Sequence, residues 1–510
     1  MREFHTIKSI YGNLKDFEVK ELRRKLSTSS NGVESHKISI KYLEILANKP
    51  DLSLIEAQKK LYNKINVSAF RKLNQRLLDK IIDVLTYKEI VELNESYDER
   101  AKNIFVQEKK LLLADMFRYR GLFNLSDELL DQIINNVKTY ECYEVLIFAL
   151  YKKRIRLPGT DSIEEIKIID ADILKYQKYS LLLSYVKKLY TNLVLMHNNS
   201  ELKRTIHEYK IAIKKIDSIL IKVDSFTFKF YSSMINAQFK SMMGDDVNAA
   251  KGLIELLEGL KDSIVYSNNR YGTILMNISL YKRNSHEYNE AQFYLNESAK
   301  YLSRINETKV IVYYQNAVLN YMYGDLLKTQ YFIKLMSNLI VEKIDLRMKN
   351  RIYFFYIINL FVSGRYQEAL LHLISFKHKS KNDISLEIEK KILQFMTVIE
   401  LAKYDHADRI YDLLRKEKNG FATSDFRLFS NKHTHFLIGR LKKVGYDFSL
   451  LTKKDIEVLD SLSNETSIKG DYLIPFTPWF KSKLKNIPYD HSAAMKEMRK
   501  KYKAEQIELA

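Results

Sequence analysis

One arrangement of residues recurs along the chain at intervals of about 40 residues. An aromatic or apolar helix leads to a Gly or small polar break, and a small residue then opens a second amphipathic helix. The clearest copy spans residues 353–376 and turns at Gly364. After that turn the apolar residues share one helical face: Tyr366, Ala369, Leu373 and Phe376. Because such a repeat cannot bury its apolar face alone, we expect neighbouring copies to stack.

The turns of the other copies define the period. Turn residues at 244, 286, 324, 364 and 402 are 42, 38, 40 and 38 residues apart. Another copy turns at Gly121, which precedes Gly244 by 123 residues, or about three periods. Weak turns at 157–160 and 197–200 fall where the two missing turns should lie, so we expect the repeat to continue through them.

Glycine and proline are too scarce for a sheet protein. The 510 residues include 14 Gly and 5 Pro, roughly 4% together where average usage is about 12%. Sandwiches, barrels and doubly wound folds need turn residues every few positions, and this composition cannot supply them. The chain also exceeds the length of about 250–300 residues at which one core stops growing. We therefore expect an all-α protein.

The order small, Gly, aromatic, Ala, apolar, small over residues ~105–420 resembles the tetratricopeptide repeat. The chain departs from that family in its period, nearer 40 than 34, and in lacking the family's early Trp and closing Pro. The resemblance implies an α-solenoid of about eight antiparallel helical hairpins. The Lys/Ile/Asn-rich composition and the segment WFKSKL are also similar to uncharacterised repeat proteins of Bacteroidetes-type bacteria.

Regions on either side of the repeats complete the predicted organisation. The predicted parts are an N-terminal helical domain, with a winged-helix-like shape as an alternative, over 1–100, the repeat array over 101–420, a C-terminal helical cap over 421–486 and a basic helix or tail over 487–510. The cluster Pro475, Pro478, Trp479 and Phe480 is either a docking motif or a segment that folds back over the last apolar face.

The resemblance implies a candidate partner site. In the tetratricopeptide family the first helix of each hairpin lines the concave face. The positions that match carry these residues: Tyr231, Met276, Arg283, Tyr314, Tyr321, Arg351, Phe354 and Phe361. Aromatic and Arg side chains dominate binding hot spots, so this strip predicts a non-catalytic protein- or peptide-binding scaffold. The alternative is that longer helices bury the strip as core.

The charge suggests a second candidate site. The chain has 83 basic and 63 acidic residues, a net charge of +20, and such an excess favours nucleic acid. Arg71, Lys72, Arg76 and Lys80 lie along one predicted helix that follows a break at 63–67, as in helix-turn-helix or winged-helix domains. This pattern indicates either a transcriptional regulator, with a DNA-binding N-terminal unit and a repeat array as sensor, or a helical cap.

Motifs for catalysis are absent from the sequence. It has no GxxxxGK[ST] or GxGxxG loop and no HExxH motif. His433 and His435 lie on different faces of a predicted helix, and the single cysteine, Cys142, lies in an apolar segment. We therefore expect no enzymatic activity, metal or cofactor.

The sequence also predicts no membrane span. The longest apolar stretch, 352–362, has 11 residues, whereas a membrane-spanning helix needs about 20. A cytoplasmic protein is therefore expected. The sequence leaves self-association open.

Overall fold

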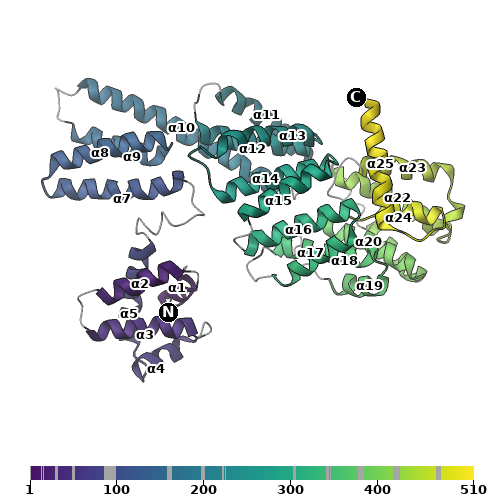
Figure 1. Ribbon diagram of the computed structural model, residues 1–510, viewed down its shortest axis with the longest axis horizontal. Helices are drawn as coiled ribbons and strands as arrows, with labels where there is room; N and C mark the ends of the chain where they lie inside the picture. The colour runs from purple at the N-terminus through teal and green to yellow at the C-terminus, as the bar shows by residue number, and fades with distance from the viewer. Residues whose placement is uncertain are drawn as a thin grey trace. The chain divides into compact units, whose positions relative to one another are not determined.

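The computed structural model describes residues 2–12, 14, 16–28, 33–48, 52–85, 99–157, 163–196, 202–220, 223, 225–302, 306–339, 344, 346–376, 384–416, 426–466 and 473–509. All regular secondary structure in these residues is helical (Figure 1), so the all-α prediction is confirmed. Contacts are densest between helices that follow one another along the chain, which is the pattern of a helical repeat.

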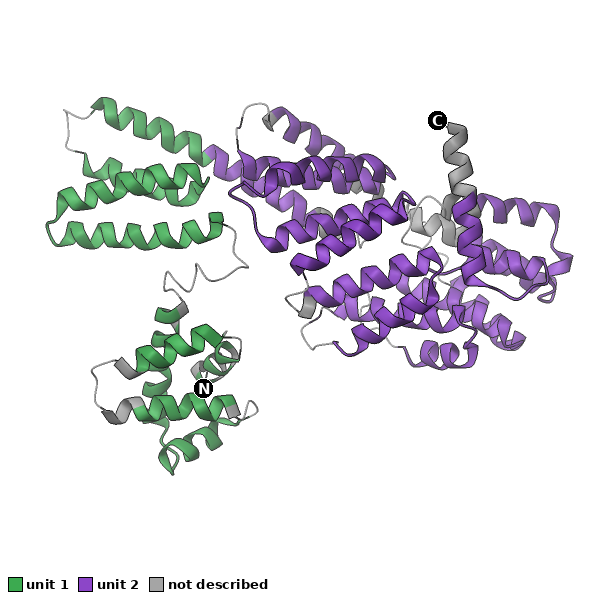
Figure 2. Cartoon of the chain, in the orientation of Figure 1, with its two compact units in different colours: residues 1–177 green, residues 178–510 purple. Residues whose placement is uncertain are grey.

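The chain divides into two compact units, residues 1–177 and 178–510 (Figure 2). The first unit begins with a bundle of α1 (Arg2–Tyr11), α2 (Asp16–Thr28), α3 (Val33–Asn48), α4 (Leu54–Tyr62) and α5 (Val67–Leu85). Phe4, Leu22, Tyr42, Leu73 and Leu77 are buried in the core of this bundle. The next helices are α7 (Glu99–Tyr119), α8 (Phe123–Thr139), α9 (Tyr143–Arg156) and α10 (Ile163–Met196), and α10 runs across the boundary between the units.

The second unit continues with further helices packed on their neighbours. These are α11 (Leu202–Leu220), α12 (Phe226–Met242), α13 (Asp246–Leu260), α14 (Asn268–Asn284), α15 (Tyr288–Leu302), α16 (Asn306–Tyr323), α17 (Leu326–Ser337), α18 (Leu346–Val362), α19 (Tyr366–Ser375), α20 (Ile384–Glu400), α21 (Tyr404–Lys416), α22 (Phe426–Lys443), α23 (Lys453–Thr466), α24 (Phe476–Leu484) and α25 (His491–Leu509). A 3₁₀ turn, η3 (Phe448–Leu450), lies between α22 and α23.

Six of the predicted turns share one backbone conformation. The angle φ is positive, between 52° and 85°, at each of these six: Gly121, Gly244, His286, Gly324, Gly364 and Ala402. The amide of the next residue then bonds to the carbonyl five residues before it, as from Asp245 to Lys240 at 2.9 Å. This Schellman-type ending favours glycine, which has no Cβ. His286 and Ala402 adopt it as well, so the repeat continues where glycine is missing. Apart from Leu157, the weak turns predicted at 157–160 and 197–200 lie outside the described residues, and the described residues between them form one long helix, α10.

The two helices of a hairpin meet at residues 12 positions apart in the sequence. Ser126 in α8 donates a hydrogen bond to the backbone oxygen of Ala114 in α7. Ser279 in α14 likewise donates to the oxygen of Ala291 in α15, at 2.7 Å. All of these residues are buried. Small residues at the crossing allow two helix backbones to approach closely, and this explains the small positions in the repeated pattern.

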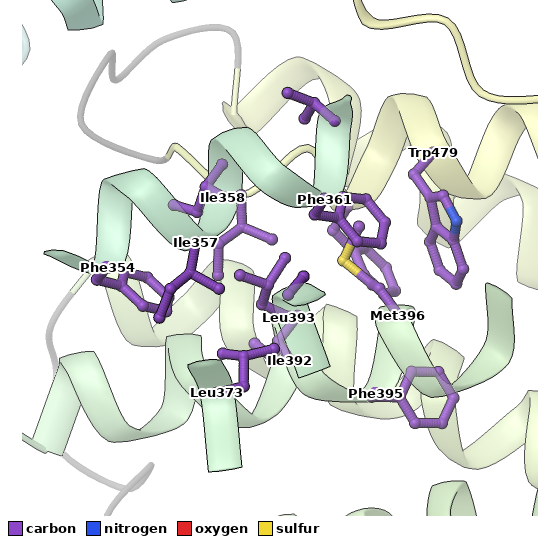
Figure 3. Packing of buried hydrophobic residues seen from close by; sticks show 14 of the residues in the cluster. Phe354, Ile357, Ile358, Phe361, Leu373, Ile392, Leu393, Phe395, Met396 and Trp479 are labelled. Atoms are coloured by element: carbon purple, nitrogen blue, oxygen red, sulfur yellow. The ribbon is translucent and has the colours of Figure 1, made fainter. Parts of the chain in front are cut away.

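The largest hydrophobic cluster lies in the second unit and includes residues of α16 to α24. Helix α18 crosses its centre, where Phe354, Ile358 and Phe361 pack among residues such as Leu393 and Met396 of α20 (Figure 3). Between residues 352 and 362 of α18, Tyr353 and Tyr356 alone are not fully buried. A run of buried residues this long covers every side of a helix, so residues 352–362 of α18 are surrounded by the protein.

A glycine at a close crossing provides a test of this packing. A Cβ at Gly272 in α14 would lie 2.7 Å from Leu302 Cγ and 2.9 Å from Tyr301 Cβ, whereas one at Gly252 in α13 would meet nothing within 4 Å. Gly272→Ala should lower the free energy of unfolding by about 1–2 kcal/mol, because overpacking outweighs the gain in helix propensity. Gly252→Ala should leave it unchanged or raise it by up to about 1 kcal/mol. If the two variants had the same denaturation midpoint, the close approach of α14 and α15 at Gly272 would be contradicted.

Candidate functional site

The strip predicted from the repeat frame lies mostly in the interior. Arg283, Tyr321, Phe354 and Phe361 are buried. Tyr231, Met276 and Tyr314 are half-buried, and Arg351 has an exposed side chain. Most of this strip is therefore part of the hydrophobic core, which was the alternative prediction. Phe354 and Phe361 are not accessible to a partner. The physical reason is that α18 is apolar on all sides and other helices enclose it.

Arg283 joins neighbouring hairpins. Its Nη1 donates to Gln315 Oε1 in α16 at 3.0 Å, and its Nη2 donates to Asn284 Oδ1 at 3.5 Å. Asn284 in turn donates to Asp246 in α13 at 3.3 Å. These bonds engage both terminal nitrogens of a buried guanidinium and link three successive hairpins, so Arg283 has a structural role in the repeat.

Tyr321 is covered by the chain's own C-terminal segment. Its hydroxyl donates to the Leu473 oxygen at 2.7 Å, and its ring stacks on His491 with centroids 4.2 Å apart. His491 Nε2 donates to the Tyr321 carbonyl at 2.9 Å, because a carbonyl can only accept, and Nδ1 faces the Tyr489 hydroxyl at 2.8 Å. Ser492 adds a bond to the Gly324 oxygen at 2.7 Å. The start of α25 is thus fastened to the end of α16.

The aromatic cluster before α25 is also internal. Phe476, Trp479 and Phe480 are buried, and the indole Nε1 of Trp479 donates to Glu400 at 2.6 Å. Lys483 pairs with the same carboxylate at 2.8 Å. The segment therefore folds back over α20 and α23, as the second of its two predicted roles requires.

A surface that the sequence analysis missed lies on α7 and α9. Large apolar side chains are exposed along one face of each helix: Phe105, Leu112, Met116 and Tyr119 on α7, and Phe148, Tyr151 and Ile155 on α9. We refer to these seven residues as the α7–α9 apolar surface. Leu112 is 64% exposed, Phe148 is 65% exposed and Tyr119 is 91% exposed. Their helical spacing places them opposite the buried residues of each helix.

Ion pairs hold the two faces side by side. Asp115, on the flank of α7, accepts from Lys152 at 2.6 Å and from Arg156 at 3.3 Å, and both partners lie on the facing flank of α9. Arg156 also pairs with Asp127 of α8 at 3.2 Å. Tyr151 is oriented by Gln177 of α10, whose Nε2 donates to the Tyr151 hydroxyl at 3.1 Å.

A sequence signal for the α7–α9 apolar surface was present in Leu111–Leu113. Three consecutive leucines in a helix cannot all face one core, so at least one of them has to point elsewhere.

The candidate basic helix is α5. Arg71, Lys72 and Arg76 are exposed on it, whereas Lys80 is half-buried and pairs with Asp83 at 3.9 Å. The preceding turn is well defined, since Asn63 takes a left-handed conformation at φ 56° and buried Gln58 accepts from the Asn66 amide at 3.0 Å. The structure thus brings three of the four predicted residues to one solvent-facing side.

In the described part of the chain, no cluster of three or more His, Cys, Asp or Glu residues could hold a metal ion. Cys142 is buried at the start of α9, where its thiol donates to the Tyr140 oxygen at 3.4 Å. Among the described helices, none has both the length and the apolar character needed to cross a membrane.

Comparison with known proteins identifies no relative: no protein-family model matches the chain, and neither a curated protein nor a solved structure matches it.

The burial of the predicted strip can be tested by substitution. Phe361→Ala should lower the free energy of unfolding by about 3–5 kcal/mol, because it leaves a cavity in the largest core. Arg351→Ala, at an exposed position of the same helix, should change it by at most about 0.5 kcal/mol. Chemical denaturation followed by circular dichroism measures both. A stable Phe361→Ala variant would instead mean that the strip is an open groove.

The His491 contact predicts an acid-sensitive C-terminal segment. Burial lowers the pKa of His491 to about 4 from its ordinary value of 6.5, because the protonated ring is poorly solvated there. The unfolded chain therefore takes up this proton first, and stability is lost as the pH falls from 6.5 towards 4. Between pH 7 and pH 4.5 the free energy of unfolding should fall in both the wild type and the His491→Gln variant. The fall should be about 2–3 kcal/mol larger in the wild type. Equal losses would contradict the buried neutral ring.

Proposed function

We propose that this chain is a non-catalytic binding protein whose helical repeats hold a protein or peptide partner on the α7–α9 apolar surface. The exposure of seven large apolar residues on two adjacent helices carries the proposal. Soluble proteins rarely leave a large contiguous apolar surface uncovered unless something binds there.

The composition of the surface suits a protein partner. Aromatic side chains and Met are enriched at the centres of protein interfaces, and Phe105, Tyr119, Phe148 and Tyr151 are aromatic. By helical spacing the exposed charges of Glu108, Lys109 and Arg120 border the face on α7. An apolar centre with charged residues around it is the usual arrangement of a binding surface. An amphipathic helix or an extended apolar peptide could lie across such a pair of helices.

The resemblance to tetratricopeptide repeats supports a binding role of this kind. The proposed surface, however, lies on other helices than the strip that the resemblance predicted. Helices α7 and α9 carry the surface, whereas Tyr321 of α16 and Phe354 and Phe361 of α18 are covered by other helices and by the C-terminal segment. The proposed site therefore lies in the first unit.

Charge substitution on the surface tests the proposal. In the double variant Leu112→Glu and Phe148→Glu, capture of a protein partner should fall at least tenfold, because two carboxylates would be desolvated at the contact. Circular dichroism should be unchanged, since both side chains are exposed. The measurement is a tagged pull-down from native lysate with nuclease present, read by mass spectrometry.

The matched control is Leu327→Glu, which introduces the same charge at a leucine that is 81% exposed on α17. Its set of captured proteins should equal that of the wild type. If the double variant and the control capture the same proteins in the same amounts, the α7–α9 apolar surface is not the binding site.

A further inference from the structure

The N-terminal bundle carries a concentrated positive surface. Residues 54–79 contain six basic residues and two acidic residues, Glu56 and Asp79. The basic residues are all exposed: Lys59, Lys60, Lys64, Arg71, Lys72 and Arg76. We refer to these six residues as the α4–α5 basic surface. In the described part of the chain none of them forms an ion pair with an acid. Glu56 is engaged in the capping box with Ser53.

The arrangement of these charges is held by the backbone. Helix α4 ends at Asn63, residues 63–66 form the turn, and α5 begins at Val67. The Asn66 side chain accepts from the Ala69 amide at 3.1 Å and so caps α5. Behind α5, Phe70, Leu73 and Leu77 are buried, and buried Asn74 accepts from the Tyr42 hydroxyl at 2.8 Å. The outer face of α5 is therefore fixed in orientation by the core.

The outer face of α5 is suited to hydrogen bonding. The residues that share it by helical spacing are Ser68, Arg71, Lys72, Gln75, Arg76 and Asp79. Arg and Gln can bond to base edges, and Ser and Lys can bond to phosphates. These residues cover about three turns, roughly 17 Å of helix, and a helix of ordinary width fits a major groove about 12 Å wide. The positive end of the helix dipole lies at the same end as the turn.

We propose that the α4–α5 basic surface binds double-stranded DNA, with α5 in the major groove and Lys59, Lys60 and Lys64 on the flanking phosphates. This binding is separate from the partner binding proposed for the α7–α9 apolar surface. The exposed face of α5 favours duplex DNA over other polyanions. Duplex RNA has a major groove too deep and narrow for a helix. Single strands are bound through exposed aromatic rings, and no aromatic residue lies on this face.

The test measures binding of the full chain to a labelled duplex of about 30 base pairs by fluorescence anisotropy, between about 50 and 200 mM salt. The wild type should bind with an affinity that falls steeply with salt. In the triple variant Arg71→Ala, Lys72→Ala and Arg76→Ala, affinity should fall at least tenfold and the salt slope should become shallower by about 2–3. Circular dichroism should not change, because all three side chains are exposed.

The control variant removes the same amount of charge elsewhere. Lys251, Lys453 and Lys454 are exposed in the second unit, and replacing all three with Ala should leave DNA affinity within about twofold of the wild type. Equal losses in the two triple variants would overturn the proposal, because the net charge alone would then explain binding. Failure of the wild type to bind at the lower salt concentration would also overturn it.

Competitors distinguish the other polyanions. A single strand, an RNA duplex and phosphatidylserine vesicles should each displace the labelled DNA less effectively than an unlabelled DNA duplex does. If the vesicles compete best, the surface binds membranes, for which exposed Ile65 and Val67 beside the turn would supply the apolar contact. If the RNA or the single strand competes best, the assignment of duplex DNA is wrong. Neither result bears on the α7–α9 apolar surface, which these variants leave intact.

Discussion

Burial of each helix against the next one in the chain is the constraint on which the repeat region depends. A helix with one apolar face is marginal in water by itself, and packing on a neighbour supplies most of its stability. Here the neighbour is brought back by a short turn with a left-handed residue, and the two helices meet at small residues 12 positions apart. Turn geometry and helix crossing are therefore parts of one requirement, which explains why His286 and Ala402 adopt a conformation that glycine would adopt more easily.

The same constraint determines which surfaces remain open. In the second unit residues 352–362 of α18 are enclosed by other helices, and the C-terminal segment covers Tyr321 of α16. In the first unit, α7 and α9 bury one side only and leave aromatic and aliphatic residues in solvent. The two proposed binding surfaces, one apolar and one basic, both belong to residues 1–177.

The turns were predictable from the sequence because a left-handed residue followed by an amphipathic helix leaves a local pattern. Gly121, Gly244, Gly324 and Gly364 mark it directly. The similar turn at Glu141, between α8 and α9, carries no glycine and could not be found this way. The 34-residue length of α10 was equally hidden, because its apolar residues do not follow one face.

The burial of the predicted strip depends on contacts between distant parts of the chain. Tyr321 and His491 are 170 residues apart, and neither sequence segment indicates the other. Helical periodicity also identifies an apolar face without showing whether another helix covers it. For this reason Phe354 and Phe148 look alike in sequence, although the first is buried and the second is 65% exposed.

Site-specific photo-crosslinking tests the proposed partner site most directly. A photoreactive phenylalanine analogue would replace Phe148 in one sample and Arg351 in another, and both positions are exposed. After irradiation in native lysate, we expect a discrete crosslinked protein from position 148 and none from position 351. A crosslink from position 351 alone would place the partner on the strip first predicted from the sequence and would contradict the account.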